Sequence, residues 1–223
     1  MVDMTAALKS VRTEKITPRL PARADSRVRF QALMAAVGAL LNKCGPSEIT
    51  IQMIAEKAKM PTATVYHFFP SAEAALLAQA RIYFQEFEAL IDMSSPQSER
   101  TSWQNSWRWN AERGRLHYTA NAARMRLLLG ADVPRDVQTV DSEFNVRLGQ
   151  IVAKQFETQT IMPHIPGFDV VCANAIEISD TFWRLSFQRT ETITDAYFDE
   201  SMRAVTAYLR CYLPEVLVFR PLD

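Results

Sequence analysis

Apolar residues recur at spacings of three and four along almost the whole chain, and this periodicity constrains the fold more than any other feature. Such spacing places side chains on one face of a helix, whereas a half-buried strand needs alternation with a period of two. No segment alternates for long enough to compete as a strand. The pattern predicts an all-α protein of about nine helices. We expect them from Asp25 to the Cys44-Gly45-Pro46 break, at 51–58, at 62–68, from Ala72 to near Ser94, and at roughly 99–119, 121–129, 135–160, 168–189 and 194–213.

Composition narrows the class of protein further. Of the 223 residues, 48% are hydrophobic and 22% are charged, a balance typical of soluble globular proteins. Only six glycines argue against glycine-rich phosphate-binding loops. No apolar run approaches the roughly 18 residues of a membrane span, and the first residues lack the apolar stretch of a signal peptide. Three well-separated cysteines fit a reducing compartment, so we expect a cytoplasmic protein with no membrane contact.

The balanced total charge conceals an asymmetry between the two ends of the chain. Residues 1–72 carry ten basic and five acidic side chains, a net charge of +5, which leaves −5 for residues 73–223. A basic end on an acidic body is typical of a protein that meets a polyanion at one end. Residues 1–24 have two prolines and no sustained apolar face, so we expect a flexible basic arm that either follows nucleic acid or is merely solvated.

Two short helices separated by a tight connection form the most informative local pattern. The first covers Ile51–Ala58, where the hydroxyl of Thr50 is placed to cap the helix. Lys59-Met60-Pro61 joins it to the second, Thr62–Phe68, and proline suits a helix start because the amide it lacks would have no partner there. Two helices joined by so short a turn predict a helix-turn-helix.

The residue types of this pattern indicate which face of the second short helix is buried. Ala55 and Ala58 allow the two helices to cross closely. A small core is expected from Ile51, Ile54, Val65, Phe68 and Phe69 with Phe30, Val37 and Leu41 of the preceding helix. The outer face is then free to enter a DNA major groove, which admits a helix whose short polar groups and methyls read base edges. That face carries Thr62, Ala63, Thr64, Tyr66 and His67.

Residues 45–76 resemble the DNA-binding signature of the tetracycline-repressor (TetR) family of transcriptional regulators. The matching positions are Thr50, Ile54, Ala55, Ala58, Thr64, Val65, Tyr66, Phe68, Phe69, Ser71 and Glu73, in register without a gap. The chain departs from the family pattern at three of its positions. Lys59 stands where the family usually has glycine and would have to adopt a left-handed conformation or a different turn. Pro61 replaces a serine and Ala72 a lysine, so we expect weaker phosphate anchoring than is usual in the family.

The resemblance implies roles for individual residues. Thr50 and Gln52 would contact phosphates at the start of the first short helix, and Lys59 could restore part of the lost positive charge. Thr62, Ala63 and Thr64 would lie against bases or the sugar-phosphate backbone, and Tyr66 and His67 would reach phosphates on the far side. Arg23 and Arg27, with Arg19 as a further candidate, would follow the adjoining minor groove, where arginine is favoured by negative potential. The partner is therefore double-stranded operator DNA.

The acidic remainder of the chain suggests a pocket and a dimer interface. Along residues 99–121, one stripe carries Trp103, Trp107, Asn110, Gly114, His117 and Asn121. Tryptophans followed by uncharged polar groups suit a cavity with an apolar wall and hydrogen-bonding groups, although the polar groups could instead pair with backbone or a buried water. We expect Trp103, Trp107, Asn110, His117 and Asn121 to bind a small apolar or aromatic effector. By the resemblance, the last two helices would pair with their symmetry mates through Phe182, Leu185, Met202, Val205 and Leu209.

Together these features predict four regions: the arm at 1–24, a DNA-binding domain at 25–70, a connecting helix at 71–95, and a ligand-binding and dimerisation domain at 96–223. The function expected is a homodimeric, ligand-responsive repressor in which ligand shifts the separation of the two recognition helices. We expect no cofactor, no metal and no enzymatic activity, because catalytic motifs and metal-ligand spacing are absent from the sequence. The alternatives are a partner-regulated factor without a pocket, or an all-α enzyme or adaptor with a relic helix-turn-helix.

Overall fold

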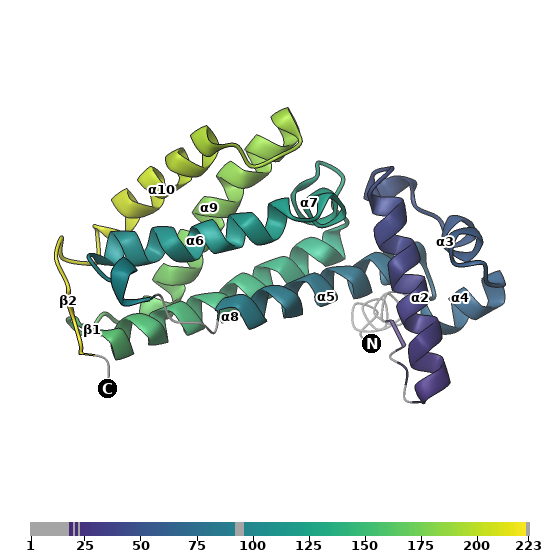
Figure 1. Ribbon diagram of the computed structural model, residues 1–223, viewed down its shortest axis with the longest axis horizontal. Coiled ribbons are helices and arrows are strands. Elements are labelled where there is room, and N and C mark those ends of the chain that lie inside the picture. Colours follow the sequence, from purple (N-terminus) through teal and green to yellow (C-terminus); the bar gives the residue numbers. More distant parts are fainter. Residues whose placement is uncertain (1–17, 20, 22, 92–95, 222–223) are drawn as a thin grey trace, which may run out of the picture. The chain divides into compact units, whose positions relative to one another are not determined.

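The computed structural model describes residues 18, 19, 21, 23–91 and 96–221, and Figure 1 shows its elements. Most of the predicted arm and residues 92–95 of the predicted connecting helix lie outside this part of the chain. Within it are nine α-helices, two short 3-10 helices and a single pair of two-residue strands, which confirms the all-α prediction. The elements are α2 Ala24–Leu41, η1 Pro46–Glu48, α3 Ile51–Ala58, α4 Thr62–Phe68, α5 Ala72–Ile91, η2 Gln97–Glu99, α6 Trp103–Thr119, α7 Ala122–Leu129, α8 Arg135–Gln159, β1 Thr160–Ile161, α9 Phe168–Thr190, α10 Asp195–Leu209 and β2 Val218–Phe219.

The chain divides into two compact units. Among the described residues, the first comprises those up to 83 and those from 122 to 138, and the second comprises those from 84 to 121 and from 139 onward. This division differs from the four regions predicted from the sequence, because α7 and the start of α8 belong with the helix-turn-helix. Helices α5 and α8 each contribute residues to both units. None of the helices in the described ranges is long and apolar enough to cross a membrane.

The first unit is built on α2, against which α3, α4 and α7 pack. Aromatic rings join α2 to the helix-turn-helix: the ring of Phe30 lies 5.9 Å from that of Phe68 and 5.4 Å from that of Phe69. On the α7 side, the Arg126 guanidinium donates to the carbonyl of Leu41 at the end of α2. The carboxylate of Asp132 accepts from the backbone amide and the hydroxyl of Ser47, at 3.0 and 2.6 Å. The segment after α7 is therefore tied to the loop that precedes α3.

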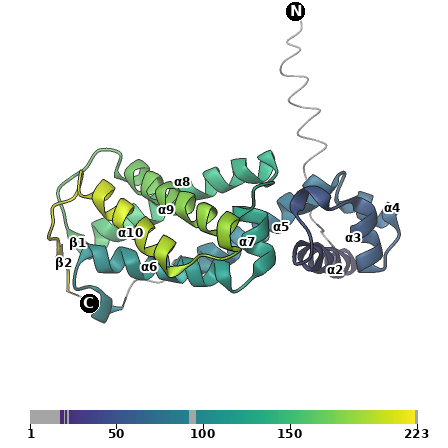
Figure 2. The ribbon, with the colours of Figure 1, turned by 90° about the horizontal axis from the view of Figure 1, so that it is seen from above.

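The second unit consists of α6, the larger part of α8, α9 and α10, with the end of α5. Helix α10 lies along α9 in both views (Figures 1 and 2). The indole of Trp183 on α9 donates to the hydroxyl of Ser201 on α10 at 3.2 Å and stacks on the ring of Phe198. Helices α8 and α9 approach closely at Gly149, where an added Cβ would lie 2.6 Å from the Asp169 carbonyl oxygen and 2.7 Å from the Ala173 amide nitrogen.

Three details of the second unit were not predicted. Strands β1 and β2 pair antiparallel through two residues each, too few to produce a recognisable alternation. Helix α6 begins at Trp103 rather than near residue 99, because the hydroxyl of Ser102 caps it by accepting from the Asn105 amide. Helix α10 ends at Leu209, before the predicted residue 213.

Candidate DNA-binding surface and ligand pocket

The turn between α3 and α4 has the geometry expected of a helix-turn-helix. The Thr50 hydroxyl accepts from the Met53 amide at 3.2 Å and so caps α3, as predicted. Lys59 ends α3 with φ 55° and ψ 44°, which is the left-handed conformation, one of the two alternatives expected from the sequence. The backbone amide of Met60 then donates to the Ala55 carbonyl, and α4 begins after Pro61. A side chain other than glycine is uncommon in this backbone region.

Helix α4 buries one face and exposes the other. Val65 and Phe68 are buried, as predicted for the small core, and the ring of Phe68 lies against Phe30 of α2. On the opposite face Thr62, Ala63 and His67 are exposed, Thr64 is half-buried, and Tyr66 exposes half of its surface. Thr50, Gln52 and Lys59 are also exposed, as are Arg19, Arg23 and Arg27. The residues predicted to contact DNA are therefore all at least partly accessible, and their individual contacts with DNA stay predictions.

Substituting Lys59→Gly tests both the strain and the charge at this turn. Glycine adopts the left-handed region freely, whereas other residues pay about 1–2 kcal/mol there, so we expect the free energy of unfolding to rise by about 1 kcal/mol in urea titrations. Loss of the cation is expected to lower the slope of log K against log salt by about 0.9 if Lys59 contacts a phosphate. Lys57→Gly is the control, because Lys57 is exposed and has a helical backbone in α3; this variant should lower the free energy of unfolding. Equal changes in the free energy of unfolding at the two sites would contradict a role for backbone strain at Lys59.

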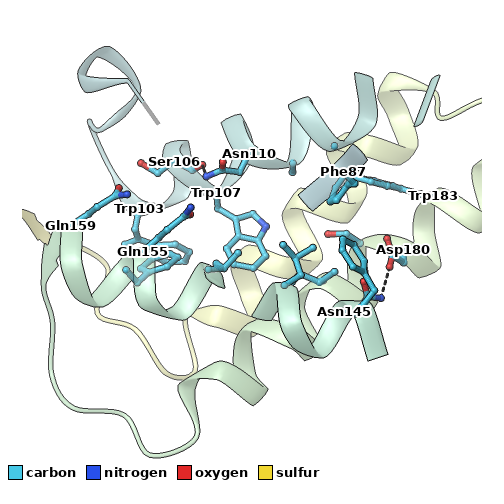
Figure 3. A pocket seen from close by; sticks show the side chains of 18 of the residues that line it. Phe87, Trp103, Ser106, Trp107, Asn110, Asn145, Gln155, Gln159, Asp180 and Trp183 are labelled. Carbon is cyan, nitrogen blue, oxygen red and sulfur yellow. Dashed lines mark hydrogen bonds between the residues drawn. The ribbon is translucent and has the colours of Figure 1, made fainter. Parts of the chain in front are cut away.

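The second unit contains a pocket between α6, α8 and α9 (Figure 3), and Phe87 of α5 and Phe219 of β2 also line it. Its volume is about 90 Å³. Trp103, Trp107 and Asn110 line it. His117 and Asn121 are not among the lining residues: the ring of His117 packs at 5.2 Å against Phe87, and Asn121 follows the end of α6, where the helical periodicity stops.

Most of the pocket wall comes from helices that the sequence did not assign to it. Helix α8 provides Phe144, Asn145, Leu148, Val152, Gln155, Phe156 and Gln159, and α9 provides Ile176, Ser179, Asp180 and Trp183. The one available signal was the presence of Asn145 and Asp180 among apolar residues of their helices. Both side chains are buried, and buried polar groups are rare enough to mark a site.

Asp180 is the centre of a small buried acidic cluster. Its carboxylate accepts from the Asn145 amide at 2.8 Å, and that amide also donates to Glu177 at 3.1 Å. Burial raises the pKa of Asp180 to about 6; the hydrogen bond from Asn145 lowers it and the charge of Glu177 raises it. Burial, and then the charge of Asp180, raise the pKa of Asp141 well above its usual range. Arg184 is the nearby cation that lowers both pKa values.

This raised pKa makes the stability of the protein depend on pH. Between about pH 4 and 6 the folded state binds a proton at Asp180 that the unfolded chain releases, so this group stabilises the fold at low pH and loses that contribution as pH rises through 6. We expect Asp180→Asn to match the wild type near pH 4 and to exceed its unfolding free energy at pH 8 by on the order of 1–3 kcal/mol. Urea titrations at both pH values, with the exposed Glu143→Gln as the control, measure the difference; a variant less stable at pH 8 would contradict it.

The residues predicted for dimerisation do not share one exposed surface. Met202, Val205 and Leu209 are buried inside a single chain, since their face of α10 packs on α9, so these side chains have no free area for a partner. Phe182 is half-buried and Leu185 is 36% exposed. The stripe of α10 that was expected to pair with a symmetry mate is covered instead by α9 of the same chain. Among the described residues there is no group of three side chains able to hold a metal ion.

The fold is that of TetR-family transcriptional regulators. A TetR-family regulator from Streptomyces coelicolor has a similar structure at 19% identity, with a TM-score of 0.61 over 85% of this chain and 99% of that chain. SmeT, the repressor of the Stenotrophomonas maltophilia multidrug efflux pump SmeDEF, is similar at 13% identity, with a TM-score of 0.62 over 83% and 91% of the two chains. A SmeT–triclosan complex matches at 14% identity, with a TM-score of 0.58 over 88% and 99%. No family model matches the sequence, and no curated protein matches it significantly.

Proposed function

We propose that this chain is a transcriptional regulator of the TetR family, a ligand-responsive repressor that binds a palindromic operator as a homodimer in the cytoplasm. The observation that carries the proposal is the outward face of α4, because its short polar groups and methyls are accessible while Val65 and Phe68 hold the helix on α2. A helix presented in this way fits a major groove. In a symmetric dimer the two copies of α4 would lie about one DNA turn apart, roughly 34–36 Å.

The pocket supports the ligand-responsive part of the proposal. An apolar cavity with a few polar groups is the usual form of a small-molecule site, and it weighs against the alternative of a partner-regulated factor without a pocket. Phe87, which lines the cavity, belongs to α5. This continuous helix begins at Ala72, shortly after α4 ends at Phe68, and the hydroxyl of Ser71 caps it. A ligand that displaces Phe87 would bias the position of α5 and so favour a state with altered spacing of the recognition helices.

Selection of bound fragments from the genome of the source organism tests the DNA-binding part. We expect retention at low salt of a pseudo-palindromic sequence whose half-sites are about 10 base pairs apart. Gel shifts on that fragment, with and without compounds that bind the protein in solution, then test induction, for which about 100-fold release corresponds to about 2.8 kcal/mol of differential ligand affinity. Retention of no fragment would favour the relic alternative, and DNA binding indifferent to every bound compound would reject induction.

The dimer interface is proposed on the exposed face of α9, which carries Asn174, Thr181, Leu185 and Gln188, with the adjoining face of α10. Leu185→Glu should place a charge in this interface, where an unpaired charge is costly. We expect the dimer dissociation constant to rise by at least about tenfold, or about 1.4 kcal/mol, in sedimentation experiments. Val216→Glu, at a residue 77% exposed near β2, is the matched control; an unchanged dimer in the Leu185 variant would place the interface elsewhere.

A further inference from the structure

One end of the pocket carries a negatively charged side chain. Of the 21 residues that line it, Asp180 is the one charged residue, and no lysine or arginine is among them. The Asp180 side chain is only 6% exposed, and Figure 3 shows it with Asn145, Phe87 and Trp183 at the end of the pocket opposite Trp103 and Gln159. An anionic ligand would meet a buried carboxylate there, in a setting where water screens charge weakly.

The surroundings of Asp180 increase this negative character. Asp141 of α8 and Glu177 of α9 act on the same buried region, and Arg184 is the cation that acts on Asp141 and Asp180. Three carboxyl groups and one guanidinium therefore act on this end of the pocket. Burial raises the pKa of Asp180 because its charged form is poorly solvated. A cation brought into the pocket would therefore replace part of the solvation that the carboxylate lost on folding.

Aromatic rings surround the same end of the cavity. The ring of Phe87 lies 5.9 Å from that of Tyr118 and 5.7 Å from that of Phe144, and the rings of Tyr118 and Trp183 are 5.7 Å apart. All four line the pocket. Ring faces attract cations, most strongly where water is excluded. A cation here would be held by a carboxylate and by aromatic faces together.

The side-chain oxygen of Asn110 is a second acceptor in the pocket wall that could bind a hydrogen-bond donor. The Asn110 amide nitrogen donates to the Ser106 carbonyl at 3.0 Å, while its oxygen is buried and accepts no hydrogen bond from the described part of the chain. Leaving a buried acceptor unpaired costs free energy. Asp180 and Asn110 therefore both present acceptor oxygens in the wall of a pocket whose surface is mostly apolar.

We propose that the effector of this pocket is a compact aromatic amine whose cationic group binds Asp180 and whose ring lies against the aromatic wall. This inference rests on the proposed function only in assuming that the bound ligand regulates DNA binding. Binding of the ligand itself can be measured without DNA. The volume of about 90 Å³ is below the roughly 150 Å³ of a cavity that holds benzene, so the ligand is small and side chains of the wall move to admit it.

Titration calorimetry with ligands of one shape and three charges tests the proposal. The probes are 2-phenylethylamine, 2-phenylethanol and phenylacetate, with tryptamine, tryptophol and indole-3-acetate as a two-ring set. We expect the amine of at least one set to bind roughly 10- to 100-fold more tightly than the matched alcohol, as expected for a buried hydrogen bond to a charged group, and the acid to bind most weakly. Equal affinities within both sets, preference for the acid, or no binding by either amine would overturn the proposal.

Two variants locate the selectivity at Asp180. Asp180→Asn keeps the shape and the hydrogen bond to Asn145 and should bring the amine within about twofold of the alcohol, while leaving alcohol affinity unchanged. Glu143→Gln, which removes an exposed carboxylate from α8, should keep the full preference. Selectivity retained in Asp180→Asn would overturn the assignment to Asp180, and if that variant does not fold, the wild-type comparison still decides. Operator binding by gel shift is scored separately, so a protein that selects amines but retains no DNA refutes the proposed regulator and not this inference.

Discussion

Replacing Ala63 by aspartate is expected to lower operator affinity by at least about 100-fold without loss of stability. Ala63 is exposed in the first turn of α4, the part of a recognition helix that lies nearest the bases. A carboxylate there would face phosphates at close range, and like charges across an interface cost several kcal/mol. The same carboxylate is favourable for folding, because negative side chains stabilise the first turn of a helix by about 0.3–1 kcal/mol.

The measurement is fluorescence anisotropy with the selected operator, together with thermal unfolding followed by circular dichroism. Ala196→Asp provides a matched control, because Ala196 is an exposed alanine at the second position of α10, in the other unit. It introduces the same charge in the same helical setting and should leave DNA affinity unchanged. Wild-type affinity in Ala63→Asp would mean that α4 does not enter the groove.

Substituting Gly149→Ala is expected to destabilise the second unit by about 2–3 kcal/mol, the usual cost of overpacking a tight contact. The added Cβ would lie 2.6 Å from the Asp169 carbonyl oxygen and 2.8 Å from the Ala173 Cβ. These are atoms of the α9 backbone or fixed to it, so relief requires the two helices to move apart.

Gly38→Ala is the matched control for this prediction. Gly38 also lies inside a helix, α2, but an added Cβ would meet nothing nearer than the Tyr83 hydroxyl at 3.8 Å. Alanine is preferred to glycine within helices by about 0.5–1 kcal/mol, so this variant should be more stable than the wild type. Urea titrations of both variants measure the difference, expected to reach about 3 kcal/mol; two variants that change in the same direction would show that close approach is not what requires Gly149.

The helix-turn-helix could be predicted from the sequence to the residue, whereas the pocket could not. Helices α3, α4 and α5 begin where Thr50, Pro61 and Ser71 indicate, because caps and proline act on the adjoining backbone. The pocket depends instead on which helices face each other. Trp103 and Trp107 of α6 line the pocket as expected, whereas Asp180 of α9 was not assigned to it from the sequence.

The same distinction explains the residues assigned to dimerisation. Periodicity shows that the stripe of Met202, Val205 and Leu209 must be covered, yet it does not identify the cover. In the structure, α9 of the same chain covers this stripe. Helix pairing within a chain and between chains uses the same apolar residues, so only the exposed surface that remains, around Leu185, can suggest a partner.

Residues 122–138 belong to the first unit, and this limits how the protein could be re-engineered. A chimaera that fused residues up to Tyr83 to a foreign sensor body would remove α7 from α2, and with it the Arg126 and Asp132 groups that bind the Leu41 carbonyl and Ser47. The transplanted part of the first unit would then expose the apolar surface of α2 that α7 covers. It would also lose the hydrogen bonds made by Arg126 and Asp132. A functional hybrid biosensor needs both stretches of the native sequence, grafted together.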